Sequence, residues 1–518
     1  MVAAVATEQL RLAELMAALS LATDLGMGQP LEQTIRTCVL AVGIAERLGV
    51  GTEARSDIYY VALLRFLGCT ADAHESADMA GGDDIALRAA IAPVLGASNG
   101  EFMAAVIPKV GSGQNPARRV GTVANMLRTG QQRSREGVVA HCEAAELLSD
   151  RLGLAPGVRA GLAHAFERWN GSGLPDRVSG EAIDLSARIV FVARDVEVLN
   201  RKNPDAWRTA LRKRTGHAYD PEIVQAFQRH GSELLEQLAV VEPWDAVLEL
   251  EPEPRPRVSD IRLDVVLEAF ADFVDMKSPH LAGHSRTVAA LAGGAAQHAG
   301  IPGAADQLRR AGLVHDLGRT SVPNGIWDKP GPLTSGEWER VRLHPYYTER
   351  VLARSSALAP LAAVAGTHHE RLDGTGYHRA LHRDALGQPG CVLAAADVYE
   401  ALTHARPHRA ALSPEAAATE MRSLGRAGQL HADAVEAVLM AAGHRRAAVA
   451  RESPSGLTER EIEVLRLICH GSTKKLVAKQ LSISTATVDH HVRHIYDKAD
   501  VKTRAGVTLF ALQNGLLQ

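Results

Sequence analysis

The amino-acid sequence predicts an all-α fold that consists of two related helical bundles and a small C-terminal helix-turn-helix domain. Ala, Leu, Val and Arg recur at helical spacing through most of the 518 residues, and stretches of alternating β-branched residues are few. One series of motifs occurs twice along the chain, as expected for a duplicated unit. A chain of this length should hold about three domains.

Two stretches predict the domain boundaries. EPEPRPR (251–257) is proline-rich and charged, a composition that favours an extended spacer over a packed element. The stretch from about Arg445 to Gly456 ends in ARESPSG, in which Ser, Pro and Gly break a helix. We therefore expect three domains, at residues 1–250, 258–445 and 457–518.

The internal repeat relates the first domain to the second. TIRTCVLAVGIAERLGV (34–50) resembles HSRTVAALAGGAAQHAGI (284–301), and ALLRFLGCT (62–70) resembles GLVHDLGRT (312–320). Both pairs share the same offset along the chain, and further matches follow later in both domains. A chance similarity would not keep this spacing, so we expect two copies of one bundle.

The second copy contains seven residues of metal-ligand type at ordered spacing: His284, His315, Asp316, His344, His368, His369 and Asp397. Imidazole and carboxylate together suit a transition metal such as iron, manganese or zinc. Seven ligands exceed what one octahedral ion binds, so the sequence predicts at least two metals. In the adjacent pair His315-Asp316, the imidazole can take one metal while the carboxylate bridges both. Such centres usually activate water against a phosphate ester.

The first copy lacks most of these ligands. The aligned positions hold other residue types, namely Thr34, Arg65, Phe66, Ala165 and Phe166. Only His141 and Asp195 remain, and a long insertion precedes His141. Two ligands cannot hold a di-metal centre, and Arg65 would repel a cation. We therefore expect a metal-free pseudo-domain that serves dimerisation, packs against the second copy, or binds an effector in the emptied pocket.

Residues 260–445 resemble the HD superfamily of metal phosphohydrolases, and more narrowly its HD-GYP branch. The matching motifs are HSRTV, HDLGR, KPGPLT, HP, HHERLDGTGYH, AADVYEAL and ARPHR, in order and at the family's spacing. The resemblance implies tandem HD-type bundles, the first degenerate, and a centre that holds two iron or manganese ions. It also implies an enzyme that hydrolyses cyclic di-GMP or related cyclic dinucleotides with a metal-bridging hydroxide, and it assigns catalytic roles to Asp316 and Arg319.

The same resemblance assigns further residues around the centre. It implies that Lys329, Arg406 and Arg409 contact the substrate phosphates. His280, on the same helical face as His284, would be either an additional ligand or a surface histidine.

Two positions depart from the family pattern. His378 replaces the signature proline, whose ring would fix the φ angle of the loop. Arg319 replaces the usual lysine, and a planar guanidinium does not occupy the place of an ammonium. We expect the domain to bind metal despite both changes. The bound metals would then either catalyse hydrolysis or be catalytically idle.

Residues 457–518 predict a helix-turn-helix. LTEREIEVLRLIC opens at Thr458 with acidic residues, an arrangement that suits a helix N-terminus, and Gly471 ends it. KKLVAKQL forms a second helix, and a turn at residues 482–484 precedes a third helix at about residues 485–499. Two short helices joined by a tight turn are typical of this DNA-binding motif.

The segment resembles the LuxR-type DNA-binding domain over its whole length. The resemblance implies phosphate contacts from Lys474, Lys475, Thr487 and Lys498, and major-groove contacts from Val488, His490, Arg493 and His494. Asp489 stands where the family often has lysine. The segment holds nine Lys and Arg against six Asp and Glu, in a chain whose formal charge is −3, so positive charge gathers where DNA would bind. The last helix, AGVTLFALQNGLL, has the apolar stripe expected of a dimer contact.

Composition predicts a cytoplasmic protein. The five cysteines lie far apart with no CxxC spacing, as expected in a reducing compartment. The N-terminus, MVAAVATEQLRLAEL, is interrupted by charges too early for a signal peptide, and no uncharged apolar run approaches the ~18 residues of a membrane span. The expected partners are double-stranded DNA, a nucleotide ligand and a second copy in a homodimer, with no membrane.

Three functions are consistent with these features. The first is a DNA-binding transcriptional regulator whose di-metal domain senses a nucleotide such as cyclic di-GMP, with hydrolysis to reset the signal. The second is primarily a cyclic-dinucleotide phosphodiesterase with a DNA tether, and the third is an iron-dependent redox or gas sensor that controls transcription. We favour the first, because a DNA-reading domain has little purpose on a free-standing phosphodiesterase.

Overall fold

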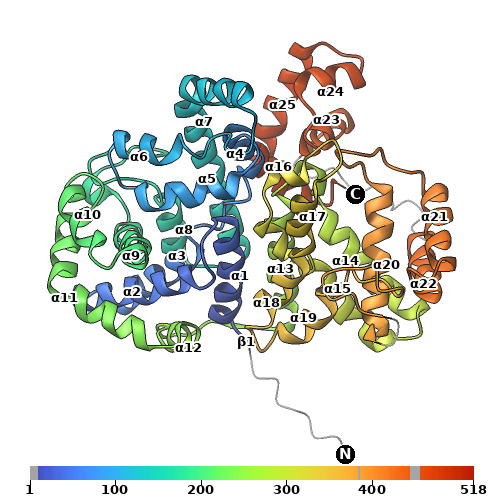
Figure 1. Cartoon of the computed structure of the whole chain (residues 1–518), viewed down its shortest axis with the longest axis horizontal. Coiled ribbons are helices and arrows are strands. Elements are labelled where there is room, and N and C mark those ends of the chain that lie inside the picture. The colour runs from blue at the N-terminus through green and yellow to red at the C-terminus, as the bar shows by residue number, and fades with distance from the viewer. Residues whose placement is uncertain (1–9, 383–384, 444–455, 518) are drawn as a thin grey trace, which may run out of the picture.

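The computed structural model describes residues 10–382, 385–443 and 456–517. Two helical bundles lie side by side, and the C-terminal helices sit above the seam between them in the view of Figure 1. The predicted all-α fold is confirmed, because within the described ranges the only strands are β1 (Leu10–Arg11) and β2 (Arg257–Val258), which pair antiparallel. Over the same ranges, none of the helices has the length and apolar character needed to cross a membrane.

The N-terminal bundle consists of α1 (Leu12–Gly26), α2 (Gln33–Arg47), α3 (Thr52–Leu64), α4 (Ala73–Ala80), α5 (Asp84–Ile91), η1 (Ala92–Val94), α6 (Asn99–Val106), α7 (Pro116–Arg151), α8 (Pro156–Ala163), η2 (Gly180–Ala182), α9 (Leu185–Lys202), α10 (Ala206–Arg214), α11 (Pro221–Val240) and α12 (Pro243–Glu249). The second bundle consists of α13 (Asp260–Asp275), η3 (Pro279–Leu281), α14 (His284–His298), η4 (Pro302–Ala304), α15 (Ala305–Val314), η5 (Leu317–Ser321), α16 (Asn324–Trp327), α17 (Ser335–Arg342), α18 (His344–Leu352), α19 (Ala359–Ala365), α20 (Gln388–Thr403), α21 (Pro414–Arg426) and α22 (Ala432–Gly443). The C-terminal helices are α23 (Glu459–Cys469), α24 (Lys474–Gln480), α25 (Thr485–Ala499) and α26 (Arg504–Gln513).

Side-chain caps of the expected kind open several of these helices. The Thr458 hydroxyl accepts a hydrogen bond from the main-chain N–H of Glu461, whose carboxylate accepts one from the Thr458 N–H. Ser484 caps α25 through the N–H of Thr487. Each cap satisfies a main-chain donor that has no partner within the first turn, which contributes about 1 kcal/mol. The third helix of the helix-turn-helix therefore begins where the sequence predicts. The predicted linker that starts near Arg445 lies outside the described residues.

The two copies of the repeat open in the same way. α2 and α14 each follow a residue in the left-handed conformation, Glu32 at φ 73° and Gly283 at φ 81°. The first helical residues are therefore Gln33 and His284. The sequence alignment, which paired Thr34 with His284, is wrong by one residue, because the capping turn and not the similarity of letters sets where the helix begins.

A close backbone contact is also shared by both copies. A β-carbon added to Gly68 would lie 2.0 Å from the carbonyl oxygen of His141, and one added to Gly318 would lie 2.0 Å from the carbonyl oxygen of His344. Only glycine permits this approach. The contact places the turn after α3 or α15 directly on the helix that carries the aligned histidine.

One hydrophobic core runs through both bundles. α1 lies at the seam (Figure 1) and packs against α2 and α3 of its own bundle and against η5 and α18 of the other. Residues 252–256 belong to no helix or strand and are half-buried or exposed, whereas Glu251, the first residue of the predicted spacer, is only 2% exposed. Its carboxylate accepts hydrogen bonds from Arg11 Nε and from the Tyr60 hydroxyl, both at 2.8 Å. A buried carboxylate with charged and neutral donors anchors the chain there.

The insertion in the first copy reaches across to the second bundle. Asp84 accepts a hydrogen bond from the Asn324 N–H at 2.8 Å and lies 3.5 Å from Lys277 Nζ, with both charged side chains buried. His74 Nδ1 lies 2.7 Å from a carboxylate oxygen of Asp328. Buried charges persist only with such partners, so the insertion is an integral part of the interface.

Arg65 fills the interior of the first bundle at the position that matches His315. Its side chain is buried, and the guanidinium carbon lies 4.9 Å from the centre of the Phe191 ring and 5.5 Å from that of Phe166. Within the described ranges the guanidinium nitrogens have no hydrogen-bond partner, and burial lowers the pKa of Arg65 to about 9. The guanidinium and the rings occupy the space that metals would need. A side chain therefore fills the position of His315 in the first copy, and the expected binding of an effector there stays a prediction.

Replacing Arg65 with methionine should leave the free energy of unfolding unchanged or raise it by up to about 2 kcal/mol, because an apolar chain of similar length removes an unpaired buried charge. Arg65→Ala should lower it by roughly 2–5 kcal/mol through the cavity it leaves. Urea denaturation followed by circular dichroism measures both. Equal destabilisation by the two variants would show that the cation itself is needed.

Candidate metal centre and DNA-binding domain

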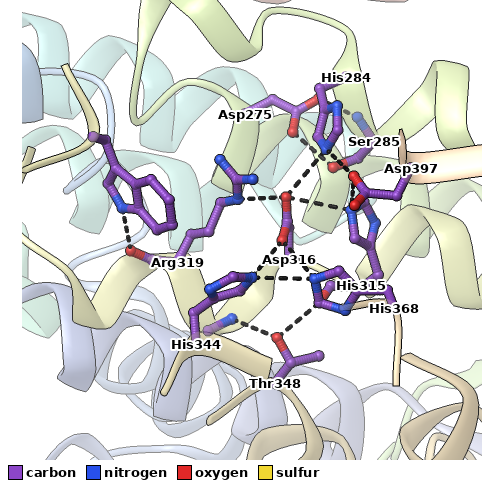
Figure 2. A network of polar contacts seen from close by, with 12 residues as sticks. Asp275, His284, Ser285, His315, Asp316, Arg319, His344, Thr348, His368 and Asp397 are labelled. Carbon is purple, nitrogen blue, oxygen red and sulfur yellow. Dashed lines mark hydrogen bonds and ion pairs between the residues drawn. The ribbon is translucent and has the colours of Figure 1, made fainter. Parts of the chain in front are cut away.

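The predicted ligands converge on one point inside the second bundle (Figure 2). They come from the first residue of α14 (His284), the end of α15 (His315-Asp316), the first residue of α18 (His344), the loop after α19 (His368-His369) and the middle of α20 (Asp397). Asp275 fixes the start of α14, because it accepts hydrogen bonds from the Ser285 N–H at 2.9 Å and the Ser285 hydroxyl at 2.7 Å. The helices therefore hold the ligands in place before any metal binds.

The carboxylate of Asp316 lies at the centre of this cluster (Figure 2). Its Oδ2 is 3.2 Å from His284 Nε2 and 3.3 Å from His315 Nε2. Its Oδ1 is 3.3 Å from His344 Nε2 and 3.4 Å from His368 Nε2. One carboxylate therefore faces two pairs of imidazoles, one pair from each oxygen. This geometry suits a carboxylate that bridges two cations.

Three of the imidazoles present Nε2 to this centre. Nδ1 of His315, His344 and His368 each donates to the main-chain carbonyl three residues earlier, at 2.6–2.7 Å. The proton is therefore on Nδ1, and the lone pair of Nε2 points inward. The Nε2 atoms of His344 and His368 are only 3.1 Å apart. Two lone pairs at that distance repel each other unless a cation lies beside them.

The donor set fits a pair of divalent transition metals. Nε2 of His284, Nε2 of His315 and Oδ1 of Asp316 are buried without a hydrogen-bond partner in the described structure. Each such atom costs about 1–3 kcal/mol if it stays unsatisfied. Burial lowers the pKa of His344 to about 4 and holds that of His369 well below its usual value, so both are neutral lone-pair donors at neutral pH. Nitrogen and carboxylate ligands together favour iron, manganese or zinc.

Asp397 closes the cage on its open side. Its Oδ1 lies 3.5 Å from His284 Nε2, and its Oδ2 lies 3.5 Å from His369 Nδ1. His280, the candidate additional ligand, belongs to neither group of clustered ligand atoms. It lines the adjacent cleft instead.

This cleft has a volume of about 210 Å³ and reaches the cage, because His369 and Asp397 line it. Arg319 and Arg406 line it as well, together with the indole of Trp327. Metal ligands at one point of a cleft and guanidinium groups around it suit an anionic, phosphate-bearing ligand.

Of the three residues predicted to contact phosphates, two line the cleft and one does not. Arg406 lines the cleft and lies 2.9 Å from a carboxylate oxygen of Glu400. Arg409 also lines the cleft, but its guanidinium donates to main-chain carbonyls, including that of Leu402 at 3.1 Å. Lys329 pairs with Glu337 at 2.7 Å at the N-terminus of α17, outside the set of cleft-lining residues. Lys329 therefore lies away from the cleft and holds a local turn, whereas the phosphate contact of Arg409 stays a prediction.

Arg319 joins the cage to the cleft. Its Nε lies 2.5 Å from Asp316 Oδ2, and its guanidinium carbon lies 4.4 Å from the ring centre of Trp327. The indole N–H donates to the Arg319 carbonyl at 3.3 Å. A planar guanidinium can stack on an indole in this way, and a lysine ammonium has no planar face to stack. Sequence reasoning missed Trp327, which no ligand pattern marks.

Glu400 is a second residue that sequence reasoning missed. Its Oε2 lies 2.5 Å from His284 Nδ1, so it does for this imidazole what main-chain carbonyls do for the others. Burial opposes its ionisation, but the charges of His284 and Arg406 outweigh burial and lower the pKa of Glu400 to about 2. A signal was available, since Glu400 follows Asp397 by about one helical turn and so lies on the same face of α20.

The DNA-binding domain exposes most of its predicted contact residues. Lys475, His490, Arg493 and His494 are exposed on α24 and α25. Lys474 is exposed but lies 2.5 Å from Asp489, so the acidic residue neutralises part of the expected phosphate-binding charge.

Three residues predicted to contact DNA interact with other residues of the same domain. Val488 is completely buried in the domain core and cannot reach the major groove. Lys498 Nζ lies 2.7 Å from Glu461 and also donates to the Gly456 carbonyl at 3.1 Å, so it stabilises the fold. The Thr487 hydroxyl lies 2.7 Å from that of Ser484, within the cap of α25. The prediction for Val488 is corrected, because the apolar stripe of a recognition helix faces the domain interior. Lys498 remains exposed, so its contact with a phosphate stays a prediction.

Glu400→Gln should weaken metal binding by about 10- to 100-fold, because the amide loses the charge that orients His284. Competition with a chromophoric chelator measures the change. Glu415→Gln, at an exposed position on α21, is the matched control and should bind metal like the wild type. Unchanged affinity in Glu400→Gln would contradict the orienting role.

Comparison with known families matches these parts of the structure. The HD domain family matches residues 97–223 and again residues 268–434. The luxR family of bacterial regulatory proteins matches residues 455–511. Both copies of the repeat and the C-terminal domain are thus recognised independently of each other, and the predicted resemblances are confirmed.

Known proteins are similar to the chain over different shares of its length. It is 32% identical over 414 residues to 3'3'-cGAMP-specific phosphodiesterase 3 of Vibrio cholerae, which covers 79% of this chain and 90% of that protein. It is 33% identical over 178 residues to a cyclic di-GMP phosphodiesterase of Thermotoga maritima, which covers 34% of this chain and 47% of that protein. The crystal structure of a cyclic GMP-AMP-specific phosphodiesterase of V. cholerae aligns with a TM-score of 0.58 at 28% identity, over 85% of this chain and 99% of that chain. The chain belongs to the HD domain family, with two copies of that domain followed by a luxR-type regulatory domain.

Proposed function

We propose that this protein is a DNA-binding transcriptional regulator whose metal-dependent HD domain binds and hydrolyses a cyclic dinucleotide. The observation that carries the proposal is the combination, in one chain, of a complete ligand cage beside an arginine-lined cleft and a helix-turn-helix with an exposed basic recognition surface. The names of the relatives, which are cyclic GMP-AMP and cyclic di-GMP phosphodiesterases, support this ligand class.

The chain's own residues account for how a phosphodiester would be held. The cleft meets the cage at His369 and Asp397, so a phosphate in the cleft would lie against the ligands. Arg319 and Arg406 would neutralise the charge that develops on the phosphate oxygens. A pair of iron or manganese ions, when bound, supplies water activated at neutral pH and polarises the phosphate.

Glu400 links substrate binding to the cage. The same carboxylate orients His284 and lies 2.9 Å from Arg406 Nη2. Arg406, which would bind a phosphate, and His284, a candidate metal ligand, therefore contact the same carboxylate. This shared contact fixes their relative positions. Hydrolysis of the bound nucleotide would end the signal that the regulator responds to.

Purified protein with Mn²⁺ or Fe²⁺ should convert 3'3'-cGAMP or cyclic di-GMP to a linear dinucleotide, measured by liquid chromatography. His284→Ala should lower the rate by more than about 100-fold, because it removes a ligand from the cage. His298→Ala, an exposed histidine on the same helix, is the control and should retain the wild-type rate. Turnover that persists in His284→Ala would rule out this centre as the site of hydrolysis.

Lys475→Ala should weaken binding to duplex DNA and reduce the salt slope by about one unit, because a phosphate contact is lost. Asp489→Ala should strengthen binding, because it frees Lys474 from its ion pair. Fluorescence anisotropy over a range of salt concentrations measures both effects. Lys502→Ala, an exposed lysine beyond α25, is the charge-matched control. A salt slope that does not change in Lys475→Ala would argue against the proposed DNA-binding face.

A further inference from the structure

The segment between α13 and α14 has two faces that serve different parts of the protein. Ser278, His280 and Leu281 line the cleft beside the metal cage. Residues 282 and 283 then connect the segment to the first candidate ligand, His284, at the start of α14. A ligand that fills the cleft would therefore contact this segment.

The other face of the segment packs against the DNA-binding domain. A β-carbon placed on Gly471, just after α23, would lie 2.8 Å from the β-carbon of Pro279. Ala282 belongs to the hydrophobic core of the DNA-binding domain. A β-carbon on Gly283 would lie 3.4 Å from a methyl of Leu512 on α26. Residues 278–283 thus separate the cleft from the DNA-binding domain by the thickness of a single chain segment.

The DNA-binding domain is docked through its last helix. Ala505 and Leu509 of α26 belong to the core that runs through the two bundles, and Leu509 is completely buried. The sequence predicted this apolar stripe as a contact with a second copy. In this structure the stripe instead packs against α7 of the same chain. A stripe that is covered in this way cannot pair with a second copy until the domain moves.

Two acidic residues of the N-terminal bundle hold α26 in place. Glu143 on α7 accepts hydrogen bonds from the Lys502 N–H at 2.5 Å and from the Thr503 hydroxyl. A carboxylate at a helix N-terminus is favoured by the helix dipole. Glu75 on α4 lies 2.7 Å from Arg504 Nη2. The degenerate copy therefore supplies the polar contacts that keep the DNA-binding domain docked.

The same bundle also holds the start of the two-faced segment. Asp84 lies 3.5 Å from Lys277 Nζ, and Asp328, which accepts from the Ser278 hydroxyl at 2.6 Å, is bound by His74. The insertion of the first copy thus contacts the segment that borders the cleft and, through Glu75, the helix that is docked.

We propose that residues 278–283 couple the cleft to the DNA-binding domain, so that a cyclic dinucleotide in the cleft shifts the segment and releases α26. This inference rests on the proposed function. A ligand can shift an equilibrium only through contacts that differ between the two states, and the residues of this segment that line the cleft provide such contacts. Release frees the apolar stripe of α26 to pair with that of a second copy, which brings two recognition helices to two half-sites.

The docking contact is tested without nucleotide. The variant Glu75→Ala/Glu143→Ala alters only the bundle side and leaves the DNA-binding domain unchanged in sequence. Hydrogen exchange of residues 503–512 should become faster, and affinity for a duplex of about 30 base pairs, long enough for two half-sites, should rise about tenfold. Glu136→Ala, an exposed residue of α7 whose carboxylate lies 2.9 Å from Gln132, is the matched control. Exchange and DNA affinity equal to the wild type would overturn the proposal.

The coupling is tested with a hydrolysis-resistant phosphorothioate analogue of 3'3'-cGAMP or cyclic di-GMP. Exchange should slow at residues 278–281 and accelerate at residues 503–512 of the wild-type protein. Slowing at the cleft with no change at α26 would overturn the coupling while the proposed function stands. No slowing at the cleft would contradict the proposed function and the coupling with it, whereas the docking contact would still be judged by the Glu75→Ala/Glu143→Ala variant.

Discussion

Four imidazoles can face Asp316 at once because a hydrogen bond from Nδ1, the nitrogen that points away from Asp316, orients each ring. Main-chain carbonyls hold three of the rings, and Glu400 holds that of His284. Each carbonyl lies one helical turn before its histidine, so the direction of a ligand follows from the direction of its helix. The cage therefore depends on how the helices pack, and the contact between Gly318 and the backbone of His344 brings two of its walls together.

The first bundle shows what happens to the same scaffold without the cage. The glycine contact with the helix of the aligned histidine persists, so the fold does not need the metals. Arg65 supplies a permanent cation among aromatic rings where the second bundle presents ligands. Asp195, which keeps the position of a ligand, lies 2.5 Å from Arg194 and 2.5 Å from the Tyr219 hydroxyl. The Asp195 carboxylate is thus paired with a cation and a hydroxyl of the chain itself and does not need a metal as a partner.

The first bundle, which has no such cage, contributes contact surfaces. Its insertion contacts the second bundle through Asp84, and the bundle contacts the DNA-binding domain through Glu143. The three parts of the protein share hydrophobic cores, since α26 residues belong to the core of the bundles and Ala282 to that of the DNA-binding domain. A change at the cleft is therefore close to the DNA-binding domain in space, although the two are far apart along the chain.

The sequence by itself determined the helical class, the duplication and the seven candidate ligands, because these depend on residue type and local spacing. It also held a signal for Glu400, one turn after Asp397. It could not show that Val488 faces the domain interior, since spacing along a helix defines its faces but not which of them is covered. Only the tertiary structure decided that Glu251 is buried, that Arg65 fills the first bundle, and that α26 docks on α7. Each of these depends on contacts between residues distant in the sequence, for which no local pattern exists.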